Sequence, residues 1–221
     1  NVTVGAGETC SSTAVLTSNP ATVSVAAGGT ISTNNIGINN SGTITTFSNA
    51  GTITATSGAG VSNSGYGLAT SGNINLLNNT GTLSGFGAGV SGYGIGLNQS
   101  GGTIDTLNNS GSIIGGTAGV AGTGTYGLLF DGTINTLNNS GSIYGSADGL
   151  IGHGVLNNFN NTGTINSGMN GVDVQGTVQN FVNGATGVLT GGVTFNQIKG
   201  ELNAVTTPGG TITVGSKTVP T

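Results

Sequence analysis

The chain has 221 residues, of which 46 are glycine and only 4% are charged. This length fits one all-β domain, and the glycine fraction lies far above the average of about 7%. Collagen is excluded because glycine does not recur at every third residue and only three prolines occur. Disordered chains are usually highly charged and poor in β-branched residues. Ile, Val and Thr are abundant here, which favours a folded β protein.

The charged residues are two lysines and six acidic residues, with no arginine, for a net charge of −4. Nucleic acids and anionic membrane surfaces both require a basic footprint, so the composition excludes both as partners. Weak charge also means weak mutual repulsion, and we expect the chain to associate readily with copies of itself. No apolar run reaches the roughly 18 residues of a membrane helix, so we expect no membrane insertion by this chain.

Residues 1–41 lack the regular repeat of the region that follows and contain only fragments of it, such as Gly29-Thr30-Ile31. Val2-Thr3-Val4 has the alternation of a short strand. Because repeat proteins need caps over their ends, we interpret 1–41 as an N-terminal cap or a subunit-joining segment. Cys10 is the only cysteine, so it forms no disulfide within the chain. We interpret it as a small buried residue, with an intermolecular bridge as the alternative.

Residues 42–188 contain a twelve-residue unit, Gly-Thr-Ile-x-x-Leu/Phe-x-Asn-x-Gly-x-Ile, in six copies. The copies are spaced by 30 residues and later by 22, and they begin at Gly42, Gly72, Gly102, Gly132, Gly154 and Gly176. The third and sixth positions are apolar and include Ile44, Ile74, Ile104, Ile134, Phe47, Leu77, Leu107, Leu137, Phe159 and Phe181. The eighth position is always asparagine: Asn49, Asn79, Asn109, Asn139, Asn161 and Asn183. The twelfth position is aliphatic, and in the last copy the match slips by one to Val188.

These columns predict a stack of coils. Gly, Thr, Asn and Ser are poor helix formers, whereas pieces such as Thr43-Ile44-Thr45 alternate as strands do. The Asn-x-Gly pieces between them are typical of turns. Stacking one copy on the next pairs each strand with its own copy about 4.8 Å away. The sequence therefore predicts an all-β, single-stranded parallel β-helix (β-solenoid) with coils of about 22–30 residues, an aliphatic interior and a ladder of hydrogen-bonded asparagines.

The longer coils carry extra residues after the twelfth position, for example Gly115–Gly124, which we expect to form loops side by side on one face. A short piece that we interpret as another strand follows each: Tyr66-Gly67-Leu68, Tyr93-Gly94-Ile95, Tyr126-Gly127-Leu128 and then His153-Gly154-Val155. On this alignment Tyr66, Tyr93 and Tyr126 form a stripe. The stripe either packs along the coils or binds sugars. His153 then takes the tyrosine position as a scaffold residue.

Residues 189–221 hold both lysines and two of the three prolines. We interpret them as a C-terminal cap or a strand-donating segment, with Ile212-Thr213-Val214 as a strand.

Two runs of residues resemble a known family. Leu107-Asn108-Asn109-Ser110-Gly111-Ser112-Ile113 and its copy at 137–143 are similar to passenger domains of autotransporters (type V secretion). The resemblance covers roughly residues 42–188 and rests on composition and period, without a catalytic signature. It implies a right-handed parallel β-helix displayed outside a Gram-negative cell. It also implies a role in adhesion, aggregation, biofilm or host contact, although some members carry enzymes as appendages.

A catalytic site is not expected. Glycoside hydrolysis needs two carboxylates, but Asp105 and Asp131 are predicted about four positions apart on neighbouring coils, roughly 13 Å along the strand. We expect Asp148 in a turn and Asp173 facing outward. His153 is the only histidine, and no group pairs with it in a triad. We expect no cofactor and no transition-metal site, while weak surface calcium binding stays open. Asn-x-Ser/Thr sequons recur at Asn39, Asn78, Asn108, Asn138 and Asn160, and we interpret these asparagines as turn residues, not glycan acceptors.

The function that these observations favour is a non-enzymatic, extracellular structural or adhesive β-solenoid that associates with itself, with a surface filament subunit as one form. The alternative is an adhesin that binds a surface glycan or a host receptor through the loops or the tyrosine stripe. An ice-binding solenoid would need a strict Thr-x-Thr face, which the mixture of Asn73, Thr103 and Thr133 does not provide. A polysaccharide-degrading enzyme would need a catalytic acid and base, and this chain lacks such a pair.

Overall fold

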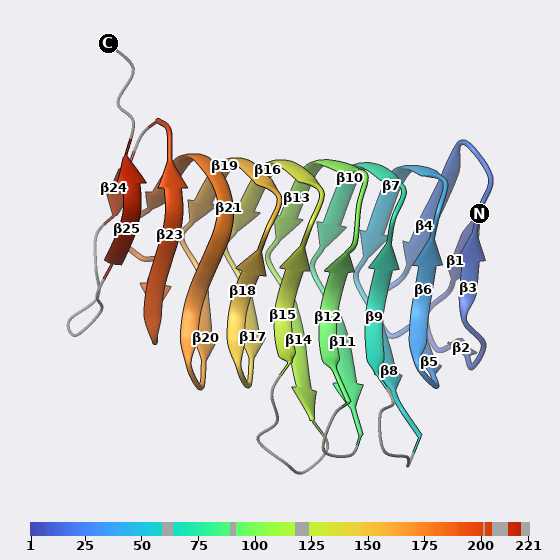
Figure 1. Cartoon of the computed structure of the whole chain (residues 1–221). Coiled ribbons are helices and arrows are strands. Elements are labelled where there is room, and N and C mark those ends of the chain that lie inside the picture. The colour runs from blue at the N-terminus through green and yellow to red at the C-terminus, as the bar shows by residue number, and fades with distance from the viewer. Residues whose placement is uncertain (59–63, 89–91, 118–123, 201, 205–211, 218–221) are drawn as a thin grey trace.

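The computed structural model describes residues 1–58, 64–88, 92–117, 124–200, 202–204 and 212–217, and every regular element in these ranges is a β-strand. Strands pair in parallel with the strand one coil later. The chain is therefore a parallel β-solenoid, and the fold expected from the repeat is confirmed. In Figure 1 the front strands rise and the rear strands descend as the chain advances from the N-terminal to the C-terminal side, so the coil is right-handed.

The strands form three stacks, named here after their first strands, and each coil up to β23 contributes one strand or part of a strand to each stack. Stack 1 comprises β1 (Val2–Val4), β4 (Ala21–Val25), β7 (Thr43–Asn49), β10 (Asn73–Asn79), β13 (Thr103–Asn109), β16 (Thr133–Asn139), β19 (Val155–Asn161), the second part of β21 (Asn170–Asn183) and β24 (Leu202–Ala204). Stack 2 comprises β2 (Thr9–Cys10), β5 (Thr30–Thr33), β8 (Thr52–Thr56), β11 (Thr82–Gly87), β14 (Ser112–Thr117), β17 (Ser142–Gly145), β20 (Thr164–Ser167) and β22 (Val188–Leu189). Stack 3 comprises β3 (Ala14–Leu16), β6 (Ile36–Asn40), β9 (Gly65–Thr70), β12 (Gly94–Gln99), β15 (Thr125–Phe130), β18 (Asp148–Gly152), the first part of β21, β23 (Gly192–Ile198) and β25 (Ile212–Lys217).

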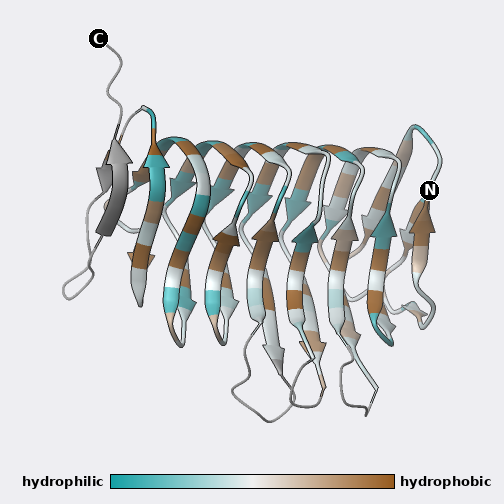
Figure 2. Ribbon diagram, in the orientation of Figure 1, coloured by the Kyte–Doolittle hydropathy of each residue, from teal (hydrophilic) through white to brown (hydrophobic). Residues whose placement is uncertain are grey.

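The interior is a set of apolar columns that run along the axis. Ile74 lies opposite Ile44 and Ile104, and Leu77 lies opposite Phe47 and Leu107. These side chains are fully buried. Figure 2 shows the same pattern, because apolar and polar bands recur at the same height on successive coils. Burial of like side chains in register explains why a chain so poor in large residues can hold one continuous core.

The stacks extend beyond the six copies of the repeat. Val2 lies opposite Val23, Cys10 opposite Ile31, and Ala14 opposite Ile38, so residues 1–41 contribute strands to all three stacks. Residues 189–221 contribute β23, β24 and β25. The proposed roles of both segments as caps, subunit-joining segments or strand donors stay predictions.

The last member of the twelfth-position column differs from the expectation. Leu189 lies opposite Ile165 and is 4% exposed, whereas Val188 pairs with Thr164. The choice of Val188 was therefore wrong. Leu189 lies six residues after Asn183, whereas Ile165 lies four residues after Asn161, so the repeat gains two residues in this corner.

The alignment of the tyrosine pieces also needs correction. Leu97 lies opposite both Leu68 and Leu128, which are 29 and 31 residues away. The strand piece in that coil is consequently Ile95-Gly96-Leu97, and the next coil but one uses Asp148-Gly149-Leu150. Tyr93 and His153 both lie outside this column. The connections before β12 and β15 differ in length, and a fixed 30-residue spacing hides this difference.

Stacks 2 and 3 approach each other closely where glycine faces inward. A Cβ atom added to Gly127 would lie 2.7 Å from Cγ2 of Ile143, and one added to Gly149 would lie 2.7 Å from Cγ2 of Ile165. In the long coils, the extra residues fall in sequence at this junction, between β8 and β9, β11 and β12, and β14 and β15. The expected loops lie partly outside the described residues. Of the stretch 115–124, residues 115–117 belong to β14.

Candidate functional site

The six asparagines of the eighth repeat position lie in a single file inside stack 1, which we call the buried ladder (Asn49, Asn79, Asn109, Asn139, Asn161 and Asn183). Each side-chain Nδ2 donates to Oδ1 of the next asparagine at 2.7–2.8 Å. Further bonds go to the backbone, as from Nδ2 of Asn109 to the carbonyl of Ser142 at 3.0 Å. The ladder begins at Asn49, because the residue opposite Asn49 in the preceding coil is Val25.

A second asparagine file lies on the outside of the same strands, one residue before each ladder position. This outer file consists of Asn78, Asn108, Asn138 and Asn160. Nδ2 of Asn108, Asn138 and Asn160 each donates to Oδ1 of the preceding member at 2.9 Å. These residues belong to the strands β10, β13, β16 and β19. Their interpretation as turn residues was therefore wrong. Asn39 likewise lies in strand β6.

The outer side of β7, β10, β13, β16 and β19 is a regular surface that we call the polar face. Besides the outer file it carries a shorter file, in which Asn135 donates to Asp105 at 2.9 Å and Asn157 donates to Asn135 at 2.8 Å. Thr103 lies opposite Thr133, and its backbone N–H donates to Oδ1 of Asn73 at 2.9 Å. Asp105 is the only ionisable residue in these five strands. The polar face therefore offers amides and hydroxyls in rows, interrupted by Leu76 and Val155, with almost no charge.

The three tyrosines do not form one file. Tyr66 and Tyr126 both lie opposite Ile95, and Tyr93 stands outside the column. A Cβ atom added to Gly124 would lie 2.2 Å from ring carbons of Tyr93, so this ring packs directly on the glycine. Tyr93 is 47% exposed. The proposed sugar-binding stripe is thus reduced to an exposed ring at Tyr93, with Tyr126 in the following coil.

Asp148 occupies the position after Tyr126 in this column, because the two residues lie opposite each other on β15 and β18. It starts a strand and is 8% exposed, so its placement in a turn was wrong. Its Oδ1 accepts the backbone N–H of Asn170 at 3.2 Å. Burial raises the pKa of Asp148 above its usual value, in spite of this hydrogen bond. Burial and the neighbouring Asp148 carboxylate also raise the pKa of Tyr126.

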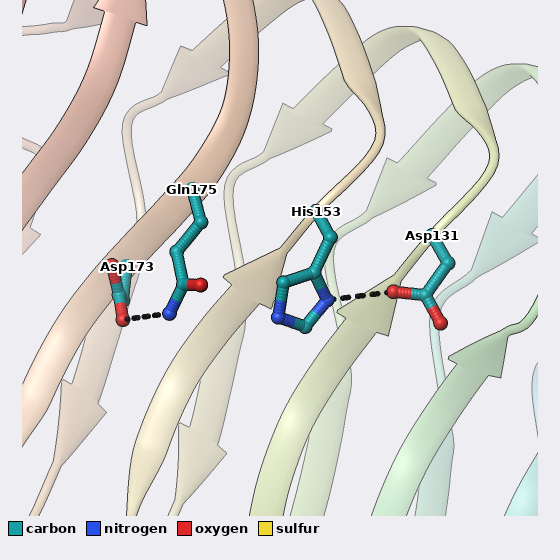
Figure 3. A network of polar contacts seen from close by, with 4 residues as sticks. All are labelled: Asp131, His153, Asp173 and Gln175. Atoms are coloured by element: carbon teal, nitrogen blue, oxygen red, sulfur yellow. Dashed lines mark hydrogen bonds and ion pairs between the residues drawn. The ribbon is translucent and has the colours of Figure 1, made fainter.

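A polar cluster lies at the corner between stacks 3 and 1 (Figure 3). Nδ1 of His153 lies 2.7 Å from Oδ1 of Asp131, one coil away, and both side chains are about half exposed. Nε2 of Gln175 donates to Oδ2 of Asp173 at 3.2 Å. His153 follows β18 at the corner, so its assignment to the tyrosine column was wrong. Asp105 and Asp131 bind different partners, Asn135 and His153.

The described ranges contain no group of three or more His, Cys, Asp or Glu side chains that could hold a metal ion. Sγ of Cys10 lies 3.4 Å from the carbonyl oxygen of Ser12, and the thiol is partly buried at the edge of the core. Within the same ranges, no helix has the length and apolar character needed to cross a bilayer. Comparisons with protein-family models, with curated proteins and with solved structures find no match to this chain.

Proposed function

We propose that this chain is a non-enzymatic structural and adhesive β-solenoid that works outside the cell by associating with copies of itself. The observation that carries the proposal is the polar face, where rows of amides and hydroxyls repeat once per coil. The autotransporter-like repeat units support display on the surface of a Gram-negative bacterium, and a filament subunit is one form that such association can take.

A second copy of the chain is the partner that best fits the polar face. Its own amide rows repeat at the same coil spacing of about 4.8 Å, so donors and acceptors can meet row for row over several coils. An outer-file amide uses at most one of its two N–H groups within the file, which leaves a donor directed to solvent. Each hydrogen bond that replaces a bond to water contributes little free energy alone. Because the rows repeat in every coil, many such bonds can form together, and their contributions to association add up.

Sedimentation velocity over a range of protein concentrations, with electron microscopy of the same samples, tests the proposal. We expect oligomers or filaments whose size grows with concentration. In the variant Thr106→Lys/Asn160→Lys, cations on the polar face should prevent association. The matched control Asn39→Lys/Asn98→Lys adds the same charge to the outer side of stack 3 and should still associate. A wild-type chain that stays monomeric at every concentration would refute the proposal.

A second candidate function is binding of a surface glycan or host receptor, and Tyr93 is the observation that favours it. Its ring is exposed and supported from behind by Gly124, and aromatic rings of this kind can stack on the apolar face of a sugar. A glycan array comparing the wild-type chain with Tyr93→Ala tests this candidate. Binding that disappears in the variant supports it, and equal binding or silence of both proteins rejects it.

A further inference from the structure

The outer side of stack 3 carries a tyrosine and two carboxylates on three consecutive coils. Tyr126 lies opposite Asp148, and Asp173 lies one coil further on, opposite Ile151. Gly149, which follows Asp148, faces the interior, and the valines on either side of Asp173 are fully buried. Because side chains alternate along a strand, both carboxylates lie on the outer side of the stack.

Tyr93 adds a second ring to this group. Its ring packs directly on Gly124, two residues before Tyr126, and it is 47% exposed. Burial is the main cause of the raised pKa of Tyr126, and Asp148, Tyr93 and Asp173 add to the rise, so all three lie near its hydroxyl. We call Tyr93, Tyr126, Asp148 and Asp173 the tyrosine–carboxylate surface. From the coil of Gly124 to that of Asp173 it spans two coil spacings, about 10 Å.

The two carboxylates of this surface have no basic partner among the described residues. No lysine or arginine occurs before residue 199, and His153 pairs with Asp131, on the side away from Asp173 (Figure 3). Burial raises the pKa of Asp148, and repulsion from Asp173 adds to the rise. A cation bound beside the two carboxylates would relieve this repulsion.

We infer that the tyrosine–carboxylate surface binds a polysaccharide of amino sugars whose amines are free and protonated. This inference rests on the second candidate function, glycan binding, and names the class of glycan. The exposed face of Tyr93 can stack on the apolar face of one sugar ring. An ammonium group on a neighbouring sugar then forms a charge-assisted hydrogen bond with Asp173, and the charge of Asp148 beside it strengthens the attraction.

Other ligand classes match these contacts less well. The two carboxylates repel acidic glycans. A quaternary ammonium ion is recognised by several rings around it, whereas one face of Tyr93 is occupied by Gly124. Tyr144 is also exposed, at 37%, but it lies opposite Ile114 and Asn166 and has no carboxylate in its column. The carboxylates therefore separate the site at Tyr93 from the tyrosine on stack 2.

Calorimetric titration of the full chain with three tetrasaccharides tests the inference slightly below neutral pH, where free amines are protonated. The probes are tetramers of glucosamine, of N-acetylglucosamine and of glucuronic acid. We expect the glucosamine tetramer to bind about tenfold more tightly than the acetylated one, because its ammonium groups form charge-assisted bonds. The acidic tetramer should not bind. Sodium chloride at about 1 M should remove most of the preference for glucosamine.

Variants of nearly the same shape identify the groups that cause the preference. The double variant Asp148→Asn/Asp173→Asn should bind the glucosamine and acetylated tetramers equally, because it removes the charges and keeps polar side chains. The matched control Asp105→Asn removes a carboxylate from the polar face and should keep the preference. Tyr93→Ala should lose binding of both tetramers, whereas Tyr144→Ala should lose neither. Circular dichroism confirms that each variant is folded.

Equal binding of the two tetramers through Tyr93 would overturn the amino-sugar assignment and leave glycan binding in place. A preference for glucosamine that persists in the double variant would also contradict it, because charges elsewhere would then be responsible. If no tetramer binds, both this inference and glycan binding fail. The proposed self-association is judged separately, by sedimentation of the chain without a ligand.

Discussion

At the scale of single residues, the two asparagines of each Asn-Asn pair have different tasks. Asn109 is buried, donates to Asn139 and accepts from Asn79. Its neighbour Asn108 lies on the outer side of the strand, where it is only partly buried, and can exchange its bonds with water. A buried polar group that loses its partner costs about 1–3 kcal/mol, whereas an exposed one costs much less. Burial, not residue type, therefore decides which asparagine stabilises the fold.

We accordingly expect Asn109→Ala to lower the free energy of unfolding by about 2–4 kcal/mol, because it leaves Asn79 and Asn139 without their partner and opens a cavity. Urea unfolding followed by circular dichroism measures this loss. The matched variant Asn108→Ala should cost about 0.5 kcal/mol or less. Equal losses in the two variants would contradict the distinction between ladder and outer file.

Asp148 gives a second prediction at this scale. Because burial raises its pKa in the folded chain, the folded state holds the proton more tightly than the unfolded state. The contribution of Asp148 to stability is therefore full below the ordinary pKa of 3.8 and is lost as the pH rises through the higher folded-state pKa. Asp148→Asn removes the ionisation and keeps an oxygen for the N–H of Asn170.

Thermal unfolding should then show Asp148→Asn more stable than the wild-type chain at neutral pH. Well below pH 3.8 the two proteins should unfold at nearly the same temperature. A variant that is less stable at neutral pH would contradict the assignment of a desolvated carboxylate.

At the scale of the element, the corners between strands must fit within the spacing that strand pairing gives to the coils. A Cβ atom on Gly111 would lie 2.1 Å from the carbonyl oxygen of Gly81 in the preceding corner, and Gly81 and Gly141 meet similar contacts. Consecutive corners therefore stack with their backbones in contact. This backbone contact, and not a left-handed backbone angle, is the reason why glycine recurs at the tenth position of the twelve-residue unit.

We expect Gly111→Ala to destabilise the chain by about 2–4 kcal/mol, since a methyl group would push adjacent corners apart. Gly101 also lies at a corner, but there the nearest atom to an added Cβ is 3.6 Å away. Gly101→Ala should therefore change the unfolding temperature little. Both variants can be compared by thermal unfolding, and equal destabilisation would refute the role of corner contact.

At the scale of the whole molecule, the outer surface of stack 1 is polar because of amides and hydroxyls, and hardly because of charged groups. Salt screens interactions between exposed charges, with a Debye length of about 3 Å at 1 M ionic strength. Hydrogen bonds between amides respond far less to salt. A solenoid that associates through the polar face should therefore behave unlike one held by ion pairs.

We expect the oligomers detected by sedimentation to persist at about 1 M sodium chloride and to dissociate in urea at concentrations below those that unfold the chain. Circular dichroism on the same samples separates dissociation from unfolding. Dissociation by salt alone would indicate that charged groups, such as Asp131, hold the copies together.

Much of this fold could be predicted from the sequence, because a solenoid repeats the same short-range pattern in every coil. The apolar columns, the parallel stacking and the asparagine positions at 49 to 183 follow from the period, and the strands of stack 1 have the expected register. In stack 1 the alternation of apolar residues and the turn residues both favour the observed strands and corners. The sequence pattern was therefore sufficient to predict the register of these strands.

Only the tertiary structure decided the features that depend on variable connections. The column of Tyr66, Ile95, Tyr126 and Asp148 was missed because connections of different length shift the register, and the recurring inward glycines at 67, 96, 127 and 149 were the signal that could have revealed it. The burial of Asp148, the pairing of Asp131 with His153 and the outward direction of Asn108 depend on neighbours a full coil away. Sequence periodicity determines which residues recur, whereas contact between coils decides which of them face the core and which face solvent.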